Sequence, residues 1–200
     1  MENSFNNIKF DLIEHLKQLF IKYDVLIENE YSFHKNKNIY SSKEIGYSIR
    51  NGKIKITCGY GLRLEHEIGH IILINNFDKL LVDNWGMKVF DIENHKLIHK
   101  WLIGTEAKVW GIENFISKNK RTYNKFWIYN CIPNSKYSID LLTDDEVNQL
   151  SKIERNVIHI MNRYETNMTN QILFDKLEER FSFIRNNIGQ NFNSLFCSLL

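Results

Sequence analysis

A short apolar segment that carries three ionisable residues constrains this chain most. Residues 66–70 read His-Glu-Ile-Gly-His, and aliphatic residues flank them on both sides without a proline. The segment is long enough for a buried helix and too short to cross a membrane. On a helix, residues four positions apart share one face, so His66 and His70 would direct both imidazoles the same way. Buried imidazoles and a buried carboxylate need polar partners, and one metal ion would satisfy all three.

The H-E-x-x-H pattern is typical of zinc hydrolases, in which the two histidines bind the metal and the glutamate acts as general base. We therefore expect His66 and His70 to bind Zn2+ and Glu67 to be the catalytic residue. The competing interpretation is a half-exposed histidine pair on an amphipathic helix, with Glu67 solvated at the surface.

A catalytic zinc site usually has a third protein ligand. The candidates downstream are Asp83, Asp91, Glu93, His95, His99, Glu106 and Glu113. Glu106 is favoured because it begins residues 106–116, where apolar residues recur at helical spacing. Thr105 is suited to cap that helix. A second helix would then bring one carboxylate to the metal.

His95 and His99 repeat the four-residue spacing, but no glutamate follows His95. We therefore interpret this pair as a solvated helix face, although either histidine could still be a ligand. A hydrogen-bond donor is also needed to stabilise a tetrahedral intermediate. The candidates for that role are His95, His99, Tyr60, Tyr123 and Tyr129.

The two motifs together resemble a known family. H-E-I-G-H is followed by Glu-Ala-x-x-Trp-Gly-x-x-x-Phe-Ile at residues 106–116, and this combination is similar to the ImmA/IrrE family of small bacterial and phage zinc peptidases. The resemblance covers roughly residues 40–118. It implies a zincin fold of the gluzincin type, a cytoplasmic protease, and cleavage of one specific regulatory protein. It also implies that His66, His70 and Glu106 bind zinc and that Glu67 is the base.

The chain departs from the family pattern at two places. Trp110-Gly111 stands where the family has an aromatic residue followed by alanine, and Ser117-Lys118-Asn119-Lys120 replaces the Met-Pro that commonly closes the second helix. These departures concern contacts to the substrate and leave the zinc ligands unchanged.

Alternating residues upstream of the motif predict a strand at residues 53–58, between two glycines. Asn51-Gly52 is a strong hairpin signal, which would join this strand to residues 44–50. We expect a small antiparallel sheet packed on the H-E-x-x-H helix. The edge along Gly52–Cys58 would then pair with a peptide or protein substrate. Cys58 could contact the metal as a thiolate, but a small buried apolar side chain is the favoured interpretation.

The remaining pattern is mainly helical. Residues 10–23 have the spacing of an amphipathic helix, residues 143–146 form a capping box that begins another, and residues 173–184 form a third. The predicted fold class is α+β and zincin-like, with additional helices at the N- and C-termini. We expect a metallopeptidase domain at residues 1–125 and a mainly helical region at residues 126–200 packed on it.

Composition limits the classes of partner and the cellular location that we expect for this protein. The 200 residues are 43% hydrophobic, and 26 basic and 24 acidic residues give a net charge of +2. We therefore expect no membrane and no nucleic-acid partner. A basic run interleaved with aromatics could hold single-stranded nucleic acid, but a solvated linker is the favoured interpretation: Lys118, Lys120, Arg121, Tyr123, Lys125, Phe126 and Trp127. Three cysteines and the absence of a signal-peptide pattern favour a reducing cytoplasm.

Two other functions remain compatible with the sequence. The first is a zincin-fold module of phage or mobile-element origin that binds a host protein without catalysis. The second is a metal-dependent hydrolase of a non-peptide bond, for which a closed pocket would replace the accessible strand edge.

Overall fold

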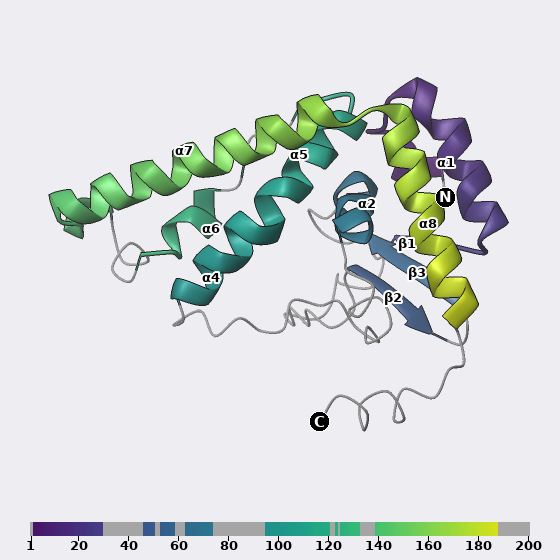
Figure 1. The fold of residues 1–200 in the computed structure, drawn as a ribbon, viewed down its shortest axis with the longest axis horizontal. Coiled ribbons are helices and arrows are strands. Elements are labelled where there is room, and N and C mark those ends of the chain that lie inside the picture. Colours follow the sequence, from purple (N-terminus) through teal and green to yellow (C-terminus); the bar gives the residue numbers. More distant parts are fainter. Residues whose placement is uncertain are drawn as a thin grey trace. The chain divides into compact units, whose positions relative to one another are not determined.

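The computed structural model describes residues 2–29, 46–50, 53–58, 63–73, 95–120, 123, 125–132 and 139–187. Two compact units make up the chain, and Figure 1 labels their elements. Unit 1 comprises residues 1–86 and 169–200, and unit 2 comprises residues 87–168. This division does not coincide with the boundary at residue 125 expected from the sequence. The mixture of helices and a small sheet confirms the α+β class.

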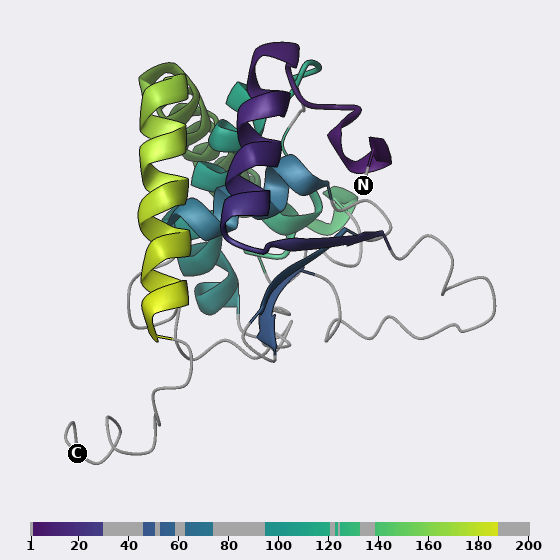
Figure 2. The same ribbon diagram turned by 90° about the vertical axis from the view of Figure 1, so that its right-hand side faces the viewer.

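Unit 1 contains the helices η1 (Glu2–Phe5), α1 (Phe10–Lys22), α2 (Leu64–Leu73) and α8 (Asn170–Asn187). The predicted N-terminal helix is confirmed, and it buries the side chains at its predicted apolar spacing: Leu12, Leu16, Leu19 and Phe20. It ends where Asp24 adopts a left-handed φ of 53°, a conformation that aspartate tolerates better than most residues. Figure 2 shows α1 running beside α8, and several side-chain contacts join them.

The sheet of unit 1 has three strands in the order β1-β3-β2. These are β1 (Leu26–Asn29), β2 (Gly46–Arg50) and β3 (Lys53–Cys58). The predicted antiparallel pairing of β2 with β3 is present, whereas β1 pairs with β3 in parallel. The expectation of a purely antiparallel sheet is therefore wrong, and the sheet is mixed. The predicted turn at Asn51-Gly52 lies outside the described residues.

β3 is the central strand, and this corrects the predicted docking edge. Its residues pair with β1 on one side, where Leu26 is opposite Lys55, and with β2 on the other, where Gly46 is opposite Thr57. Both hydrogen-bonding edges of β3 are therefore used within the sheet. Residues Lys55 to Thr57 therefore have no free edge for a peptide. The sequence indicated an edge strand because it did not reveal β1 as a partner.

Helix α2 packs against α8 and against strands β2 and β3. α8 contributes four side chains that are almost completely buried: Leu173, Leu177, Phe181 and Ile184. The Arg180 guanidinium of α8 donates from Nε to the carbonyl oxygen of Ile72 at 3.3 Å. The last carbonyls of a helix lack intrahelical donors, so Arg180 supplies one at the C-terminal end of α2.

Unit 2 begins with a helix that changes its winding midway. α4 (His95–Trp101) continues into a π-helical segment, η4 (Leu102–Glu106), and then into α5 (Ala107–Ile116). The Ala107 amide donates to the carbonyl of Leu102, five residues back. The predicted helix from residue 106 is present, but it does not begin there, and Thr105 does not cap it.

The rest of unit 2 packs on this helix. α6 (Lys125–Tyr129) and η6 (Ile139–Leu141) lead into α7 (Asp144–Asn167), whose predicted capping box is confirmed. The Glu146 amide donates to Thr143 Oγ1 at 3.3 Å, and the Thr143 amide donates to Glu146 Oε2 at 2.9 Å. The core consists of these buried residues: Ile98, Leu102, Ala107, Trp110, Ile128, Cys131, Ile132, Leu150, Ile153, Val157 and Met161.

Helices α5 and α7 lie close together at Gly111. A Cβ atom at this position would lie 2.4 Å from the Met161 carbonyl oxygen and 2.7 Å from Tyr164 Cβ. The glycine that departs from the family pattern therefore permits a backbone contact that alanine would block. In the part of the chain that the structure describes, no helix combines the length and the apolar character needed to span a bilayer.

Candidate metal site

Helix α2 places the two motif histidines on one face, as their spacing predicts. The Nε2 atoms of His66 and His70 are 3.2 Å apart, and the rings are nearly perpendicular at 77°. His66 is buried and His70 is half-buried. Burial lowers the pKa of His70 well below its usual value of 6.5, and the neighbouring His66 lowers it further. The neutral imidazole is the form that binds a metal ion.

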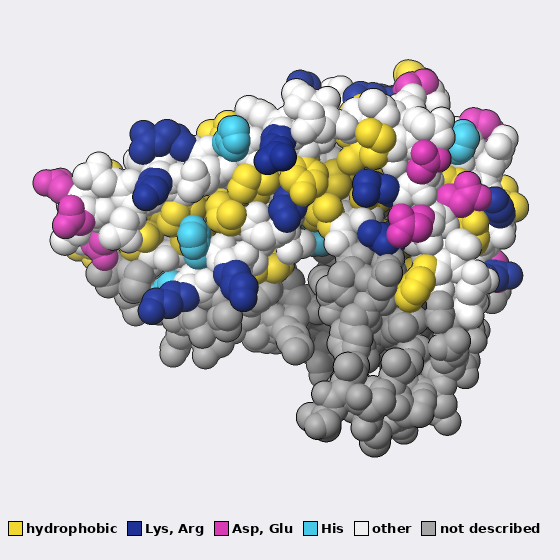
Figure 3. All heavy atoms as spheres, in the orientation of Figure 1, with side chains coloured by type: hydrophobic (Ala, Val, Ile, Leu, Met, Phe, Trp, Pro, Cys, Tyr) yellow, Lys and Arg dark blue, Asp and Glu magenta, His cyan; other side chains and the backbone are white. Residues whose placement is uncertain are grey.

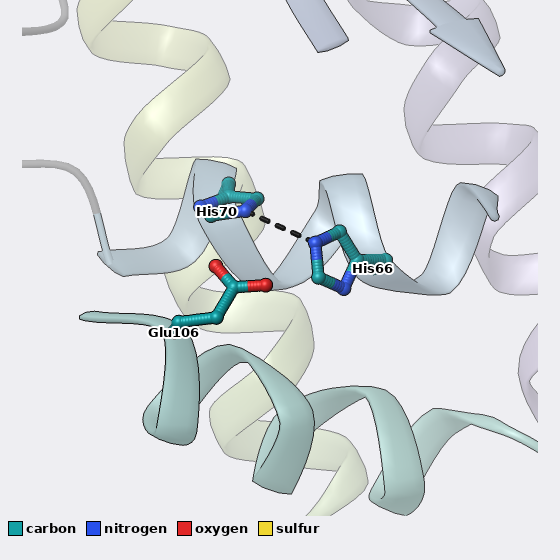
Figure 4. Close-up of side chains that lie close together, drawn as sticks. All are labelled: His66, His70 and Glu106. Atoms are coloured by element: carbon teal, nitrogen blue, oxygen red, sulfur yellow. Dashed lines mark hydrogen bonds between the residues drawn. The ribbon is translucent and has the colours of Figure 1, made fainter. Parts of the chain in front are cut away.

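Glu106 is the last residue of the π-helical segment, and only 4% of it is exposed. His66, His70 and Glu106 each offer a ligand atom, and these atoms all lie within 4.8 Å of one another. Figure 4 shows the Glu106 carboxylate turned toward the two imidazoles. This is the one group of three potential ligands found among the described residues, and it can hold a metal ion.

The donor set and its spacing fit a divalent metal such as zinc. Two imidazole nitrogens and one carboxylate are a common ligand set of catalytic zinc sites. With zinc–nitrogen bonds of about 2.05 Å and tetrahedral angles, two ligand nitrogens are separated by about 3.3 Å. The histidine pair already has this separation, at 3.2 Å. A glutamate side chain with three rotatable bonds can adjust its carboxylate to the same ion.

Glu67 is also buried, with 4% of its surface exposed. This excludes the interpretation of Glu67 as a solvated surface residue. Its neighbour Glu65 is fully buried, and the Arg63 guanidinium lies 3.5 Å from its carboxylate. The first turn of α2 therefore holds two carboxylates away from water. Such burial is costly for structural residues and common at functional sites.

The other candidate ligands that the structure describes, His95, His99 and Glu113, are not in the group. His95 uses Nδ1 to contact the carbonyl oxygen of Asn130 at 2.9 Å, so it supports the packing of α4 on α6. Glu113 is buried on α5 but is not among the grouped ligands. Asp83, Asp91 and Glu93 lie outside the described residues.

Of the three tyrosines considered as hydrogen-bond donors to an intermediate, the structure describes Tyr123 and Tyr129. The Tyr123 hydroxyl donates to Glu154, and this bond raises the pKa of Tyr123 to about 12. Its proton is thus already directed to a carboxylate. Tyr129 is half-buried on α6, and Tyr60 lies outside the described residues.

Sequence reasoning missed two features around the histidines and Glu106. Arg180 contacts Ile72, which lies 108 residues earlier in the chain, and no local sequence signal connects the two. The π-helical segment was missed because periodicity analysis assumes a uniform helical turn. No protein-family model, curated protein or solved structure matches this chain.

Proposed function

We propose that this protein is a zinc-dependent peptidase in which His66, His70 and Glu106 bind the metal and Glu67 is the general base. The observation that carries the proposal is the grouping of the three ligand atoms within 4.8 Å. The burial of Glu67 beside the first ligand supports it, since an acid there is otherwise unfavourable.

A bound zinc ion would polarise the scissile carbonyl and lower the pKa of a bound water from about 15.7 toward about 7. Glu67 accepts a proton from the attacking water and later delivers it to the leaving amine nitrogen. The low pKa of His70 favours its neutral form, which is the form that binds a metal ion. General acid-base catalysis of this kind contributes about 10² to 10⁴ in rate.

The substrate class follows from the resemblance to ImmA/IrrE peptidases, whose members act on a specific regulatory protein. We propose the same class here. Docking of the substrate along β3 is not part of the proposal, because β1 and β2 occupy both edges of that strand. A zincin-like fold, suggested by the same motifs, also belongs to this proposal.

Metal analysis of the purified protein tests the ligands. We expect about one equivalent of zinc in the wild type and its loss in His66→Ala, His70→Ala and Glu106→Gln. His99→Ala and Glu113→Gln are matched controls, because they remove a histidine of identical spacing and a buried carboxylate of α5. Loss of zinc from Glu113→Gln, with retention in Glu106→Gln, would contradict the third ligand.

Glu67→Gln tests catalysis separately from binding. The variant should keep its zinc and lose about 10² to 10⁴ in kcat/KM toward peptides of a random library that the wild type cleaves. If the wild type binds zinc and cleaves no peptide, the result would favour a binding module over a peptidase. Full activity of Glu67→Gln would refute the role of this residue.

A further inference from the structure

One stripe of α7 in unit 2 has an unusual distribution of charge. Lys152, Arg155, His159 and Arg163 follow one another at steps of three, four and four residues, so they lie on the same side of the helix. All four are exposed. At 1.5 Å per residue, the row extends for about 17 Å along the helix axis.

The rest of this stripe carries hydrogen-bonding groups without negative charge. Asn148, Asn156, Asn162 and Thr166 fall on or beside the same side of α7 by helical spacing. Within residues 148–166 of α7, the carboxylates lie elsewhere. Glu154 and Glu165 occupy a different side of the helix, where Lys125 and Lys120 pair with them.

The remaining acidic residues of α7 are confined to its first turn: Asp144, Asp145 and Glu146. Figure 3 shows this segregation as basic and histidine side chains over α7 and α4, with acidic side chains gathered at the beginning of α7. Lys96 and Lys100 of α4 are exposed as well. The net charge of +2 conceals the segregation, because the acidic residues balance the sum from other surfaces.

We propose that this face of α7, defined by Lys152, Arg155 and Arg163, binds the phosphodiester backbone of nucleic acid. Lysine, arginine, asparagine and threonine are the side chains that contact phosphates most, and they specify no sequence by doing so. Along 17 Å, each strand of a duplex presents about five phosphates, so a row of three cations has a partner for every charge. This surface is independent of the proposed peptidase function.

The composition of the stripe favours nucleic acid over an acidic protein. Stable protein interfaces have an apolar or aromatic centre surrounded by a polar rim. The stripe from residue 148 to residue 166 has no apolar side chain at its centre, and the exposed Val147 lies on another side of α7. A surface of cations and amides alone is suited to a polyanion whose charges are evenly spaced.

Fluorescence anisotropy with a labelled 20-base-pair duplex of arbitrary sequence tests the proposal on the full chain. The face variant is Lys152→Gln, Arg155→Gln and Arg163→Gln combined. The control variant is Lys9→Gln, Lys17→Gln and Lys176→Gln combined, at half-exposed positions of unit 1. Both lose three positive charges and change the net charge identically, from +2 to 2 − 3 = −1.

We expect the wild type to bind with a steep salt dependence between 50 and 200 mM KCl. The face variant should bind at least about tenfold more weakly at 50 mM KCl, and its salt slope should fall by about 2.7, which is 0.9 for each of three lost contacts. The control should keep its slope and bind within about threefold of the wild type. Lys152→Gln alone should reduce the slope by about 0.9.

Three results would overturn the proposal. The first is no binding of the duplex by the wild type at 50 mM KCl. The second is equal weakening in both triple variants, which would assign the effect to net charge alone. The third is displacement of the duplex by polyglutamate at the same concentration of negative charge, which would identify an acidic polypeptide as the preferred partner. We expect the same zinc content in the wild type and in every variant. Failure of the nucleic-acid proposal would therefore not affect the peptidase proposal.

Discussion

At the scale of single residues, Gly111 decides how closely two helices approach. A methyl group here would meet the backbone carbonyl of Met161 at 2.4 Å and the Cβ of Tyr164 at 2.7 Å. A backbone atom cannot move aside as a flexible side chain can. Alanine would otherwise be preferred in a helix by about 1 kcal/mol. The steric term is larger, because overpacking of a core costs about 1 to 3 kcal/mol.

Gly111→Ala should therefore lower the free energy of unfolding by about 1 to 3 kcal/mol in urea titrations followed by circular dichroism. Gly104→Ala is the matched control, since a Cβ at the exposed Gly104 would meet no atom within 4 Å. That variant should be unchanged or more stable by up to about 1 kcal/mol. Equal stability of the two variants would refute the close contact.

Two of the three candidate ligands could be predicted from sequence because their geometry is local. Four residues of helix fix the relation of His66 to His70, and the Nε2 separation of 3.2 Å reflects it. Glu106 was selected among seven candidates by the helix that follows it, and it is the one that joins the group. Glu65 gave no signal, because its burial depends on segments distant in sequence.

At the scale of elements, the π-helical segment explains why the core pattern of unit 2 changes phase. Core residues of the long helix follow at steps of four, five and three: Ile98, Leu102, Ala107 and Trp110. A step of five does not belong to a regular α-helix, but a π turn accommodates one additional residue. In a uniform α-helix, Glu106 would share the face of Leu102, four residues earlier, and would be directed into this core.

Deletion of Gly104 should convert this segment into regular α-helix. Leu102 and Ala107 would then be four residues apart, so both remain directed at α7 and the core is kept. Glu106 still precedes Ala107 directly, and its direction relative to α5 does not change. We expect unchanged or higher stability and full zinc content, measured by thermal unfolding and metal analysis. A destabilisation above about 2 kcal/mol would show that the π turn itself is required.

The sheet was predictable only where its pairing is local. Asn51-Gly52 indicated the β2–β3 pair, which is antiparallel. β1 was missed because its partner residues in β3 lie almost thirty positions away, as with Leu26 and Lys55. A four-residue strand has too few alternations to be distinguished from a loop. The wrong assignment of β3 as an edge follows from this omission.

At the scale of the whole molecule, unit 1 is assembled from both ends of the sequence. α8 belongs with α2 and the sheet, although all of unit 2 intervenes in the chain. The sequence indicated a C-terminal helix, but helical spacing cannot specify which surface a helix covers. The boundary at residue 125 was placed by composition and motif order, which carry no information on contacts across eighty residues.

Truncation after Met168 should therefore unfold unit 1 and leave unit 2 folded. α8 provides four fully buried apolar side chains, and burial of each contributes about 1.5 to 3 kcal/mol. Their sum of about 6 to 12 kcal/mol equals the entire stability of a typical domain. We expect loss of zinc and aggregation of the truncated chain.

Truncation after Asn187 is the control, because it removes none of the contacts described for α8. This shorter deletion should retain zinc and unfold cooperatively. Zinc retained after truncation at Met168 would contradict the assignment of α8 to the support of α2.

Because α8 belongs to unit 1 but is synthesised after unit 2, the order of synthesis has a consequence in the cell. A ribosome completes residues 87–168 before it has made the helix that covers α2, and domains fold as units while the chain emerges. The nascent protein therefore holds His66 and His70 on an unsupported helix until translation passes residue 187. Under the proposed function, the chain would stay inert on the ribosome and gain its metal only after α8 is in place.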